Sequence, residues 1–558
     1  VSEAHLSFLK WLSDYYLTHA GVALKSSFFE EVTKVAVSSK QSAVSSQTSN
    51  ISISQSQNSK LQTLKSELSD VYDCIKGKKY KSFLFHAPSI SHEYSLVNEV
   101  LNTFRFDIHG AIILVPEIGQ IEKAELISRG IFGERVCVLH SKISKKKRVE
   151  TIEKIITGKS DIVVGTRSAI LAPLKHVSFI AVMGEHSAPY KGEEGLRYNA
   201  RDVAVMRGFI EKSCVILSSI CPSIESIYNS KIGKYSILDV STQGFKRPSI
   251  KIVDMSKEKK SISKDIIRKA KDVISKNGRF LFLINRKGYS LLRCGDCGHI
   301  FRCKKCHVPL VFYKNKGIVM CHHCCYEEKV SEICDECKGF NIKSVGSGTE
   351  RIKEELEEAL KEEVRLNGFN SLNKNISDMV QIVQRVQFTR YPLSADLDVM
   401  PFIVGTGYAL RKLRDETFNA VTIVNTDMLL SLPDFRIYER TFQEIVQISQ
   451  MIKTEGNIYL QTHYPKNKIL QFIKNYDFNK FYEYELSQRK LLNFPPFSRI
   501  IVFNILLKKD VQKFLHDIQK TIKDTLTDGI EILGPVEVPP VVKSYKHCIQ
   551  MLLKSKDR

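Results

Sequence analysis

The sequence has no run of about 18 consecutive apolar residues, the length that a helix needs to cross a bilayer. Its first residues also lack the basic, apolar and small-residue segments of a secretory signal. Acidic residues are scarce relative to basic ones, 61 against 83, so the formal net charge is +22. We therefore expect a cytoplasmic protein with no membrane role, and the basic excess favours nucleic acid as its partner.

Apolar residues make up 43% of the 558 residues, which is enough for several domains with their own cores. Residues 38–60 are rich in Ser and Gln, and this composition is typical of a flexible linker. The first residue is Val, and Leu6–Tyr16 resembles the end of a helical element. We expect residues 1–37 to be the remnant of an N-terminal domain.

Short apolar runs alternate with longer mixed segments in residues 61–245, which predicts an α/β lobe with a parallel, doubly wound sheet. A second α/β lobe is predicted over 246–290 and 346–478, although 352–400 shows no interpretable pattern. A cysteine-rich module at 291–345 interrupts it, and an α+β domain is expected at 479–558. The predicted strands are Lys81–Phe85, Ala111–Val115, Val136–Leu139, Asp161–Val164, Phe179–Val182, Val215–Leu217, Ile250–Asp254, Arg279–Ile284, Phe402–Val404, Ala420–Val424 and Asn457–Gln461.

Eight of the fourteen cysteines form four Cys-x-x-Cys pairs. Two such turns can complete a tetrahedral Zn²⁺ site, so four pairs provide two closed Cys₄ sites and predict two Zn²⁺ per chain. A disulfide framework is the alternative, but a reducing compartment disfavours it. The expected ligands are Cys294, Cys297, Cys303, Cys306, Cys321, Cys324, Cys334 and Cys337.

Further motifs follow one another in order along most of the chain: Leu114–Ile118, Gly165–Pro173, Tyr190–Asp202, Asn285–Tyr289, Gly348–Arg351, Pro433–Arg436, Glu439–Thr441, Gln461–His463 and Phe494–Ser498. In this order, around this cysteine spacing, they resemble the PriA family of replication-restart helicases. The resemblance implies two RecA-like helicase lobes with a double Cys₄ zinc insertion. It also implies a DNA-binding, winged-helix region at the N-terminus.

The same resemblance implies DNA forks and single strands as ligands. It implies protein partners among primosome components, helicase-loading proteins and single-stranded DNA-binding protein. It further implies that the outer cysteine pairs share one zinc ion and the inner pairs share the other.

The segment 86–94 departs from the family's phosphate-binding loop. Glu93 occupies the position of the lysine that contacts the triphosphate, and Tyr94 that of the Mg²⁺-binding hydroxyl. Met183 and Gly184 occupy the positions of the Mg²⁺-binding Asp and the water-activating Glu. Glu185 follows one residue out of register, which on a strand would direct it to the opposite face.

The third helicase segment, Gln447–Thr454, has lost both of its arginines. Met451 and Thr454 occupy their positions, and Lys453 is a poor substitute for a guanidinium group. Loss of an arginine finger alone costs about 10³–10⁵ in rate. We therefore expect no catalytic residues, no nucleotide cofactor and no ATP turnover.

Several other residues have two interpretations each. Arg302, Lys304, Lys305 and Lys314 favour nucleic-acid contact at the zinc module, and the alternative is a stabilised insertion without such a role. Tyr190 and Tyr198 could stack on bases or pack in the core. The remaining candidates for DNA contact are Arg167, Arg197, Arg201 and the run Lys145–Arg148.

Three functions are compatible with these observations. The leading hypothesis is a replication-restart protein that binds forked or single-stranded DNA and recruits replication proteins without unwinding. The alternatives are an active ATP-dependent 3′–5′ DNA helicase with unusual residues, and a protein-binding scaffold with no DNA role.

Overall fold

The computed structural model describes residues 2–16, 18–28, 31, 68–192, 195–238, 245–284, 290–304, 310–313, 317–321, 326–345, 351–359, 380–383, 401–431, 434–507, 530–538 and 547–555. The chain divides into two compact units, Val1–Phe245 and Lys246–Arg558. The predicted linker at 38–60 lies outside the described residues. No helix among the described residues has the length and apolar content that crossing a membrane requires.

The first unit is built on a seven-stranded sheet in the order β3-β4-β2-β5-β6-β1-β7, whose neighbouring strands run parallel. Strands β2, β4, β5 and β6 are buried along their whole length, as a sheet covered on both faces requires. The strands are β1 Lys81–His86, β2 Ala111–Leu114, β3 Val136–Leu139, β4 Ile162–Gly165, β5 Phe179–Val182, β6 Cys214–Ser219 and β7 Ser236–Leu238.

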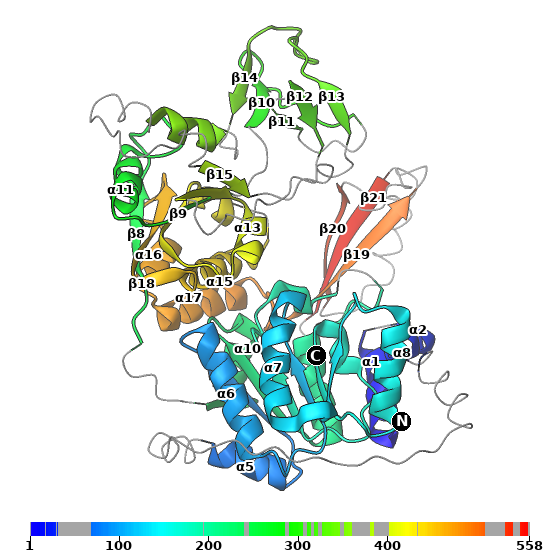
Figure 1. Cartoon of the computed structure of the whole chain (residues 1–558). Helices are drawn as coiled ribbons and strands as arrows, with labels where there is room; N and C mark the ends of the chain where they lie inside the picture. Colours follow the sequence, from blue (N-terminus) through cyan, green and yellow to red (C-terminus); the bar gives the residue numbers. More distant parts are fainter. Residues whose placement is uncertain are drawn as a thin grey trace. The chain divides into compact units, whose positions relative to one another are not determined.

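Helices cover this sheet, and α6 and α7 lie side by side (Figure 1). The first two helices belong to the same unit, because Phe8 and Leu12 of α1 are part of the core cluster that contains the sheet residues Ile112 and Val163. The helices are α1 Glu3–Tyr15, α2 Ala20–Ser26, α5 Ser69–Lys76, α6 Ile90–Thr103, α7 Ile121–Phe132, α8 Lys145–Ile156, α9 Ala200–Glu211 and α10 Ile224–Lys231.

The second unit contains a six-stranded parallel sheet in the order β15-β16-β9-β17-β18-β8. Its strands are β8 Ser249–Asp254, β9 Phe280–Leu283, β15 Val380–Val383, β16 Phe402–Gly405, β17 Phe418–Ile423 and β18 Ile452–Thr462. Its helices are α11 Lys264–Ser275, α13 Gly407–Lys412, α14 Thr426–Leu430, α15 Ile437–Ser449, α16 Lys468–Lys474 and α17 Phe478–Leu491.

The cysteine-rich module forms a five-stranded antiparallel sheet in the order β13-β12-β11-β10-β14. Its small core includes Phe301, Leu310 and Val319 together with the buried Cys303 and Cys321. The strands are β10 Ser290–Cys294, β11 Val311–Tyr313, β12 Ile318–Met320, β13 Glu327–Lys329 and β14 Ile342–Val345.

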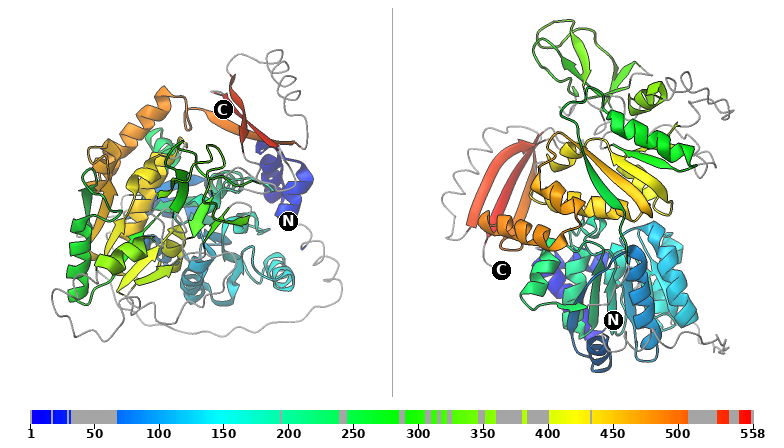
Figure 2. Two further views of the ribbon diagram at one scale, coloured as in Figure 1. Left: turned by 90° about the horizontal axis from the view of Figure 1, so that it is seen from above. Right: turned by 90° about the vertical axis from the view of Figure 1, so that its left-hand side faces the viewer.

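A three-stranded antiparallel sheet, β19-β21-β20, forms the last part of the chain (Figure 2). Its strands are β19 Arg499–Leu507, β20 Ile530–Val538 and β21 His547–Ser555. Helix α17 precedes this sheet and packs on α15, where the Phe442 and Phe481 rings stack at 4.2 Å. The predicted α/β class, with two lobes, a cysteine insertion and a small C-terminal domain, is confirmed.

Candidate functional site

The two outer cysteine pairs come together at one end of the antiparallel module. The Cys294, Cys297, Cys334 and Cys337 thiols lie within 4.8 Å of one another. Two Sγ–Sγ distances, Cys294 to Cys337 and Cys297 to Cys334, are 3.5 and 3.6 Å. Four sulfurs about 2.3 Å from a tetrahedral metal ion would be about 3.8 Å apart, so the arrangement fits such an ion. The four side chains can therefore hold a metal ion.

Backbone geometry prepares this cluster for a metal. The Asp296 N–H points at Cys294 Sγ at 3.4 Å, the kind of contact that orients a thiolate ligand. Gly298 follows with a φ of 79°, in the left-handed region that glycine adopts easily. The second predicted site is only partly visible, because Cys303 and Cys321 are buried in the module and Cys306 and Cys324 lie outside the described residues.

The segment that corresponds to the phosphate-binding loop begins with a short connection between a strand and a helix. Strand β1 ends at His86 and α6 begins at Ile90, with Ser89 as its N-cap residue. Of the three connecting residues, Pro88 has no N–H, and the Ala87 N–H donates to Ser219 O at 2.8 Å. A phosphate cradle needs several free amides, and two of the three connecting residues offer none.

Glu93, at the lysine position, faces the interior and is only 3% exposed. Its Oε2 accepts two hydrogen bonds of 2.7 Å, from the Gly184 N–H and the Ser218 hydroxyl. Burial raises the pKa of Glu93 to about 7, although these two hydrogen bonds act in the opposite direction. The carboxylate thus joins α6, the turn after β5 and strand β6.

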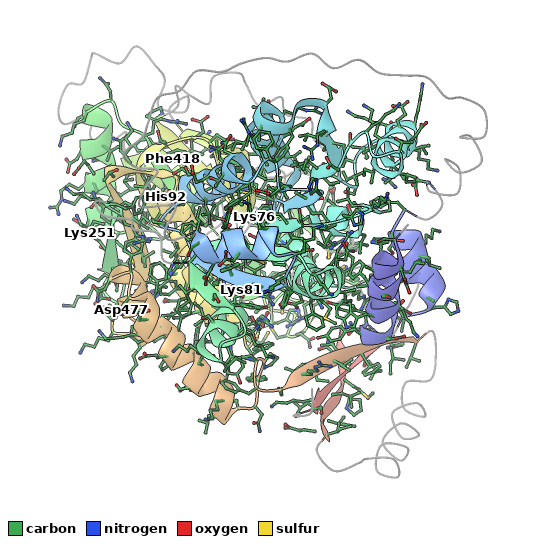
Figure 3. The ribbon with its side chains drawn as sticks, turned by 90° about the horizontal axis from the view of Figure 1, so that it is seen from below. Lys76, Lys81, His92, Lys251, Phe418 and Asp477 are labelled. Carbon is green, nitrogen blue, oxygen red and sulfur yellow. The ribbon has the colours of Figure 1, made fainter. Side chains whose placement is uncertain are left out.

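The neighbouring side chains of α6 are also used internally. The Tyr94 hydroxyl donates to Gln120 O at 3.3 Å, and the Lys123 ammonium lies 4.4 Å from the Tyr94 ring centroid. The His92 ring, labelled in Figure 3, is 2.7 Å from Ser89 Oγ. No side chain in this stretch supplies the cation that binding a triphosphate requires.

Strand β5 ends at Val182, so Met183, Gly184 and Glu185 lie in the following turn rather than on a strand. Met183 is buried, and its carbonyl accepts the Tyr190 hydroxyl at 2.7 Å. Gly184 has a φ of 57°, and a Cβ there would lie 2.9 Å from Pro116 Cγ. A side chain at position 184 therefore does not fit this backbone.

The Glu185 carboxylate is used for contacts inside the lobe. Its carboxylate accepts hydrogen bonds from the Ser223 N–H at 2.6 Å and from the Arg201 guanidinium at 3.3 Å. Burial raises its pKa, as it does for Glu93. Burial also lowers the pKa of His186 to about 4, so this ring is neutral near pH 7. Glu185 is outside β5, so it is not placed on the opposite face of a strand as we expected.

The segment that has lost its arginines runs from the end of α15 into β18. Met451 is buried, whereas Lys453 and Thr454 are exposed. The register changes between the pairs Phe418–Ile452 and Ala420–Asn457, so residues 453–456 of β18 oppose only Asn419 of β17. This bulge carries no guanidinium group.

The other predicted contact residues have different environments. Tyr190 and Tyr198 are buried, which agrees with core packing rather than base stacking. Arg201 is buried between Glu185, Asp202 and Glu225. Arg197 is exposed, and Arg167 donates to Lys191 O at 3.0 Å.

The structure describes the lysine run at 145–148 and part of the basic surface that was predicted for the cysteine-rich module. Helix α8 begins at Lys145, with Ser144 as the N-cap. Lys304 pairs with Glu328 at 2.7 Å, so it is not a free cation. Lys305 and Lys314 lie outside the described residues.

One buried ionic network was not predicted from the sequence. Arg489 of α17 contacts Glu439 at 2.7 Å and Glu485 at 3.0 Å. The guanidinium also lies 5.2 Å from the Phe435 ring, which stacks on Phe494 at 4.9 Å. Phe435, Glu439 and Phe494 fall in motifs recognised in the sequence, whereas Arg489 and Glu485 fall between motifs. The pattern alone does not reveal that these residues contact one another.

Known proteins similar to this chain were found along its whole length. A family model described as the primosomal protein N C-terminal domain matches residues 490–558. Replication restart protein PriA of Rickettsia felis is 28% identical over 567 residues, which cover 99% of this chain and 84% of that protein. The Bacillus subtilis protein of the same name is 27% identical over 503 residues, with 87% and 61% covered.

A PriA protein from Synechocystis is 30% identical over 465 residues, covering 79% of this chain and 55% of that protein. Among solved structures, RecG bound to a three-way DNA junction gives a TM-score of 0.41 at 12% identity, covering 78% of this chain and 47% of RecG. A likeness this weak carries no argument about function.

Proposed function

Because this chain belongs to the PriA family of replication restart proteins, we propose that it binds forked or single-stranded DNA and recruits replication proteins without ATP-driven unwinding. Proposed partners are primosome components, helicase-loading proteins and single-stranded DNA-binding protein, in the cytoplasm. The net charge of +22 supports a polyanionic ligand.

The observation that carries the loss of ATP turnover is the position of Glu93. A carboxylate replaces the cation expected at this position, and hydrogen bonds to Gly184 and Ser218 hold it inside the lobe. A triphosphate approaching from solvent would meet a connection poor in free amides and a buried acid instead of an ammonium group. Met183 and Gly184 offer no side-chain oxygen for Mg²⁺.

We also propose that the cysteine clusters hold zinc, two ions per chain. In the first site the ligands are Cys294, Cys297, Cys334 and Cys337, whose thiols are already together. The second site would use Cys303, Cys306, Cys321 and Cys324. A closed set of four sulfurs leaves no position for water, so the role of the metal is structural.

Two measurements on the full chain test this function. Binding of a labelled fork should weaken steeply with salt, because each neutralised phosphate releases counterions. Phosphate release from Mg–ATP in the presence of the fork should stay at background and should not change in Lys453→Ala. Fork-stimulated phosphate release would instead identify an active helicase, and no shift of fork or duplex at micromolar protein would favour the protein scaffold.

A further inference from the structure

The segment that follows β18 consists of the loop 463–467 and Lys468, the first residue of α16, and it lies at an edge of the second sheet that has no assigned role. Strands β17, β18 and β8 are neighbours and parallel, so their carboxyl ends meet at this edge. Ligands of open parallel sheets bind at such edges. The segment carries an exposed tyrosine, an exposed histidine and two lysines in the sequence His463-Tyr464-Pro465-Lys466-Asn467-Lys468.

Hydrogen bonds hold this loop in place. The Asp427 carboxylate accepts from the Thr462 hydroxyl, from the His463 N–H at 2.9 Å and from the His463 ring at 3.0 Å. The Tyr464 N–H donates to Thr462 Oγ1 at 3.0 Å, and the Tyr464 carbonyl accepts the Asn467 N–H at 3.0 Å. The loop is therefore ordered before any ligand arrives, which lowers the entropic cost of binding.

Tyr464 is nevertheless 69% exposed, more than any other tyrosine among the residues that the structure describes. Tyr15 and Tyr72 are also exposed, but Tyr15 stacks on Trp11, and Tyr72 packs 5.5 Å from Phe104. No such ring partner is found for Tyr464 within the described ranges. A rigidly mounted aromatic ring that faces solvent has a free surface on which a planar group can stack.

Exposed lysines lie on the loop that carries this ring and on a neighbouring loop. Lys466 and Lys468 are exposed beside it, and Lys257 and Lys259 are exposed on the loop after β8. The two loops are joined, since the Met255 N–H donates to Thr462 O at 2.9 Å. The nearby acids keep their charge although each accepts a backbone N–H: Asp254 from Ser256, Glu258 from Lys264 and Asp427 from His463. The four lysines outnumber these three acids.

We infer that this surface, made of Tyr464, Lys466, Lys468 and Lys257, binds single-stranded DNA, with Tyr464 stacking on an unpaired base and the lysines contacting phosphates. An aromatic ring beside lysines is how sequence-tolerant single-strand sites are built. Paired bases already stack on each other in a duplex, so the surface favours single strands. The inference rests on the proposed DNA binding and adds the surface on which a single strand would bind.

The test is fluorescence anisotropy of a labelled thymidine oligonucleotide with the full chain. Tyr464→Ala should weaken binding about 5- to 100-fold, and Tyr464→Phe should stay within about twofold because it keeps the ring. Lys466→Gln with Lys468→Gln should reduce the slope of log Kd against log salt by about 0.7 for each phosphate that is no longer neutralised, whereas Tyr464→Ala should leave the slope unchanged.

Phe106→Ala is the matched control, because Phe106 is 78% exposed beside Arg105 but belongs to the first unit. This variant should bind like the original protein. A photocrosslink from a 5-iodo-deoxyuridine oligonucleotide should map by mass spectrometry to the peptide that contains Tyr464.

Salt-dependent binding of the original protein together with unchanged affinity in Tyr464→Ala would overturn the inference and leave the proposed function intact. A loss of affinity in Tyr464→Phe as large as in Tyr464→Ala would overturn the stacking role. Absence of any DNA binding by the original protein would overturn both proposals.

Discussion

The cysteine cluster and the surroundings of Glu93 differ in how well their side chains suit a ligand. In the cluster, both the residue types and their placement suit a metal ion, and four thiols lie within 4.8 Å of one another. Around Glu93, parallel strands and a helix are in place, but the side chains at the positions expected to bind a nucleotide are Glu93, Met183 and Gly184. A packed scaffold does not by itself supply the chemistry of a site.

The physical reason lies in what each site contributes to folding. The module has a small core, so a metal ion bound by its thiols would supply much of its stability. The first lobe has a larger core of its own, built on the seven-stranded sheet. Around that sheet Glu93 is used for hydrogen bonding and Met183 for packing.

The largest effect is expected from a substitution that removes one thiol of the cysteine cluster. Cys334→Ser should remove about one metal ion per chain and unfold the module, because structural zinc supplies about 10–16 kcal/mol of folding free energy in small domains. Elemental analysis and limited proteolysis measure both effects. Cys137→Ala, at a buried cysteine of the first sheet, is the control and should keep its full metal content. Normal metal content in Cys334→Ser would show that this thiol is not a ligand.

A smaller effect is expected where the nucleotide lysine is restored. Glu93→Lys should lower the free energy of unfolding by about 3 kcal/mol, because a buried ammonium would face the Gly184 N–H and the Ser218 hydroxyl. Urea denaturation measures this change. Glu93→Gln keeps an acceptor oxygen and should stay within about 1 kcal/mol of the original near pH 7. Hydrolysis of ATP by Glu93→Lys would contradict the view that the whole site is lost.

The smallest effect is a pH dependence. The folded-state pKa of Glu93 is about 7, above its ordinary value of 4.5, so the folded chain holds this proton more tightly. Its contribution is complete below about pH 4.5 and is lost as pH rises through about 7, by about 2.5 kcal/mol between pH 5 and pH 8. Urea denaturation over this range should show that the stability of Glu93→Gln falls less, or rises more, with pH than that of the original protein. The raised pKa of Glu185 acts in the same direction as that of Glu93 and the lowered pKa of His186 in the opposite one, so the difference between the two proteins reports Glu93. Equal declines in both proteins would assign the effect elsewhere.

The strands are predictable where apolar residues are continuous. Val136–Leu139 and Phe179–Val182 match β3 and β5 residue for residue, because a buried parallel strand carries its pattern locally. For strand β18 the sequence predicts only Asn457–Gln461, whereas the strand runs from Ile452 to Thr462. Its first part is a polar bulge with exposed residues, and such a segment has no alternation to detect.

The sequence predicts which residues depart from the expected site, but it does not predict the contacts that these residues make in the fold. The sequence shows that Glu93 stands where a lysine is expected. It does not show that the carboxylate reaches Gly184 and Ser218, which are 91 and 125 residues away along the chain. Likewise the cysteine spacing predicts ligands, but spacing alone leaves the pairing open. Contacts between residues distant in sequence depend on the folded sheet, and local patterns do not encode them individually.

Gly184 limits which side chains the turn after β5 can accept. Its φ of 57° and the 2.9 Å from a would-be Cβ to Pro116 Cγ mean that a glutamate introduced here would require the turn itself to move. An engineered acid at this position would therefore cost stability before it could serve any chemistry, and the neighbouring Met183 would still offer magnesium no side-chain oxygen. Installing a metal site in this turn would need a redesigned backbone as well as new side chains.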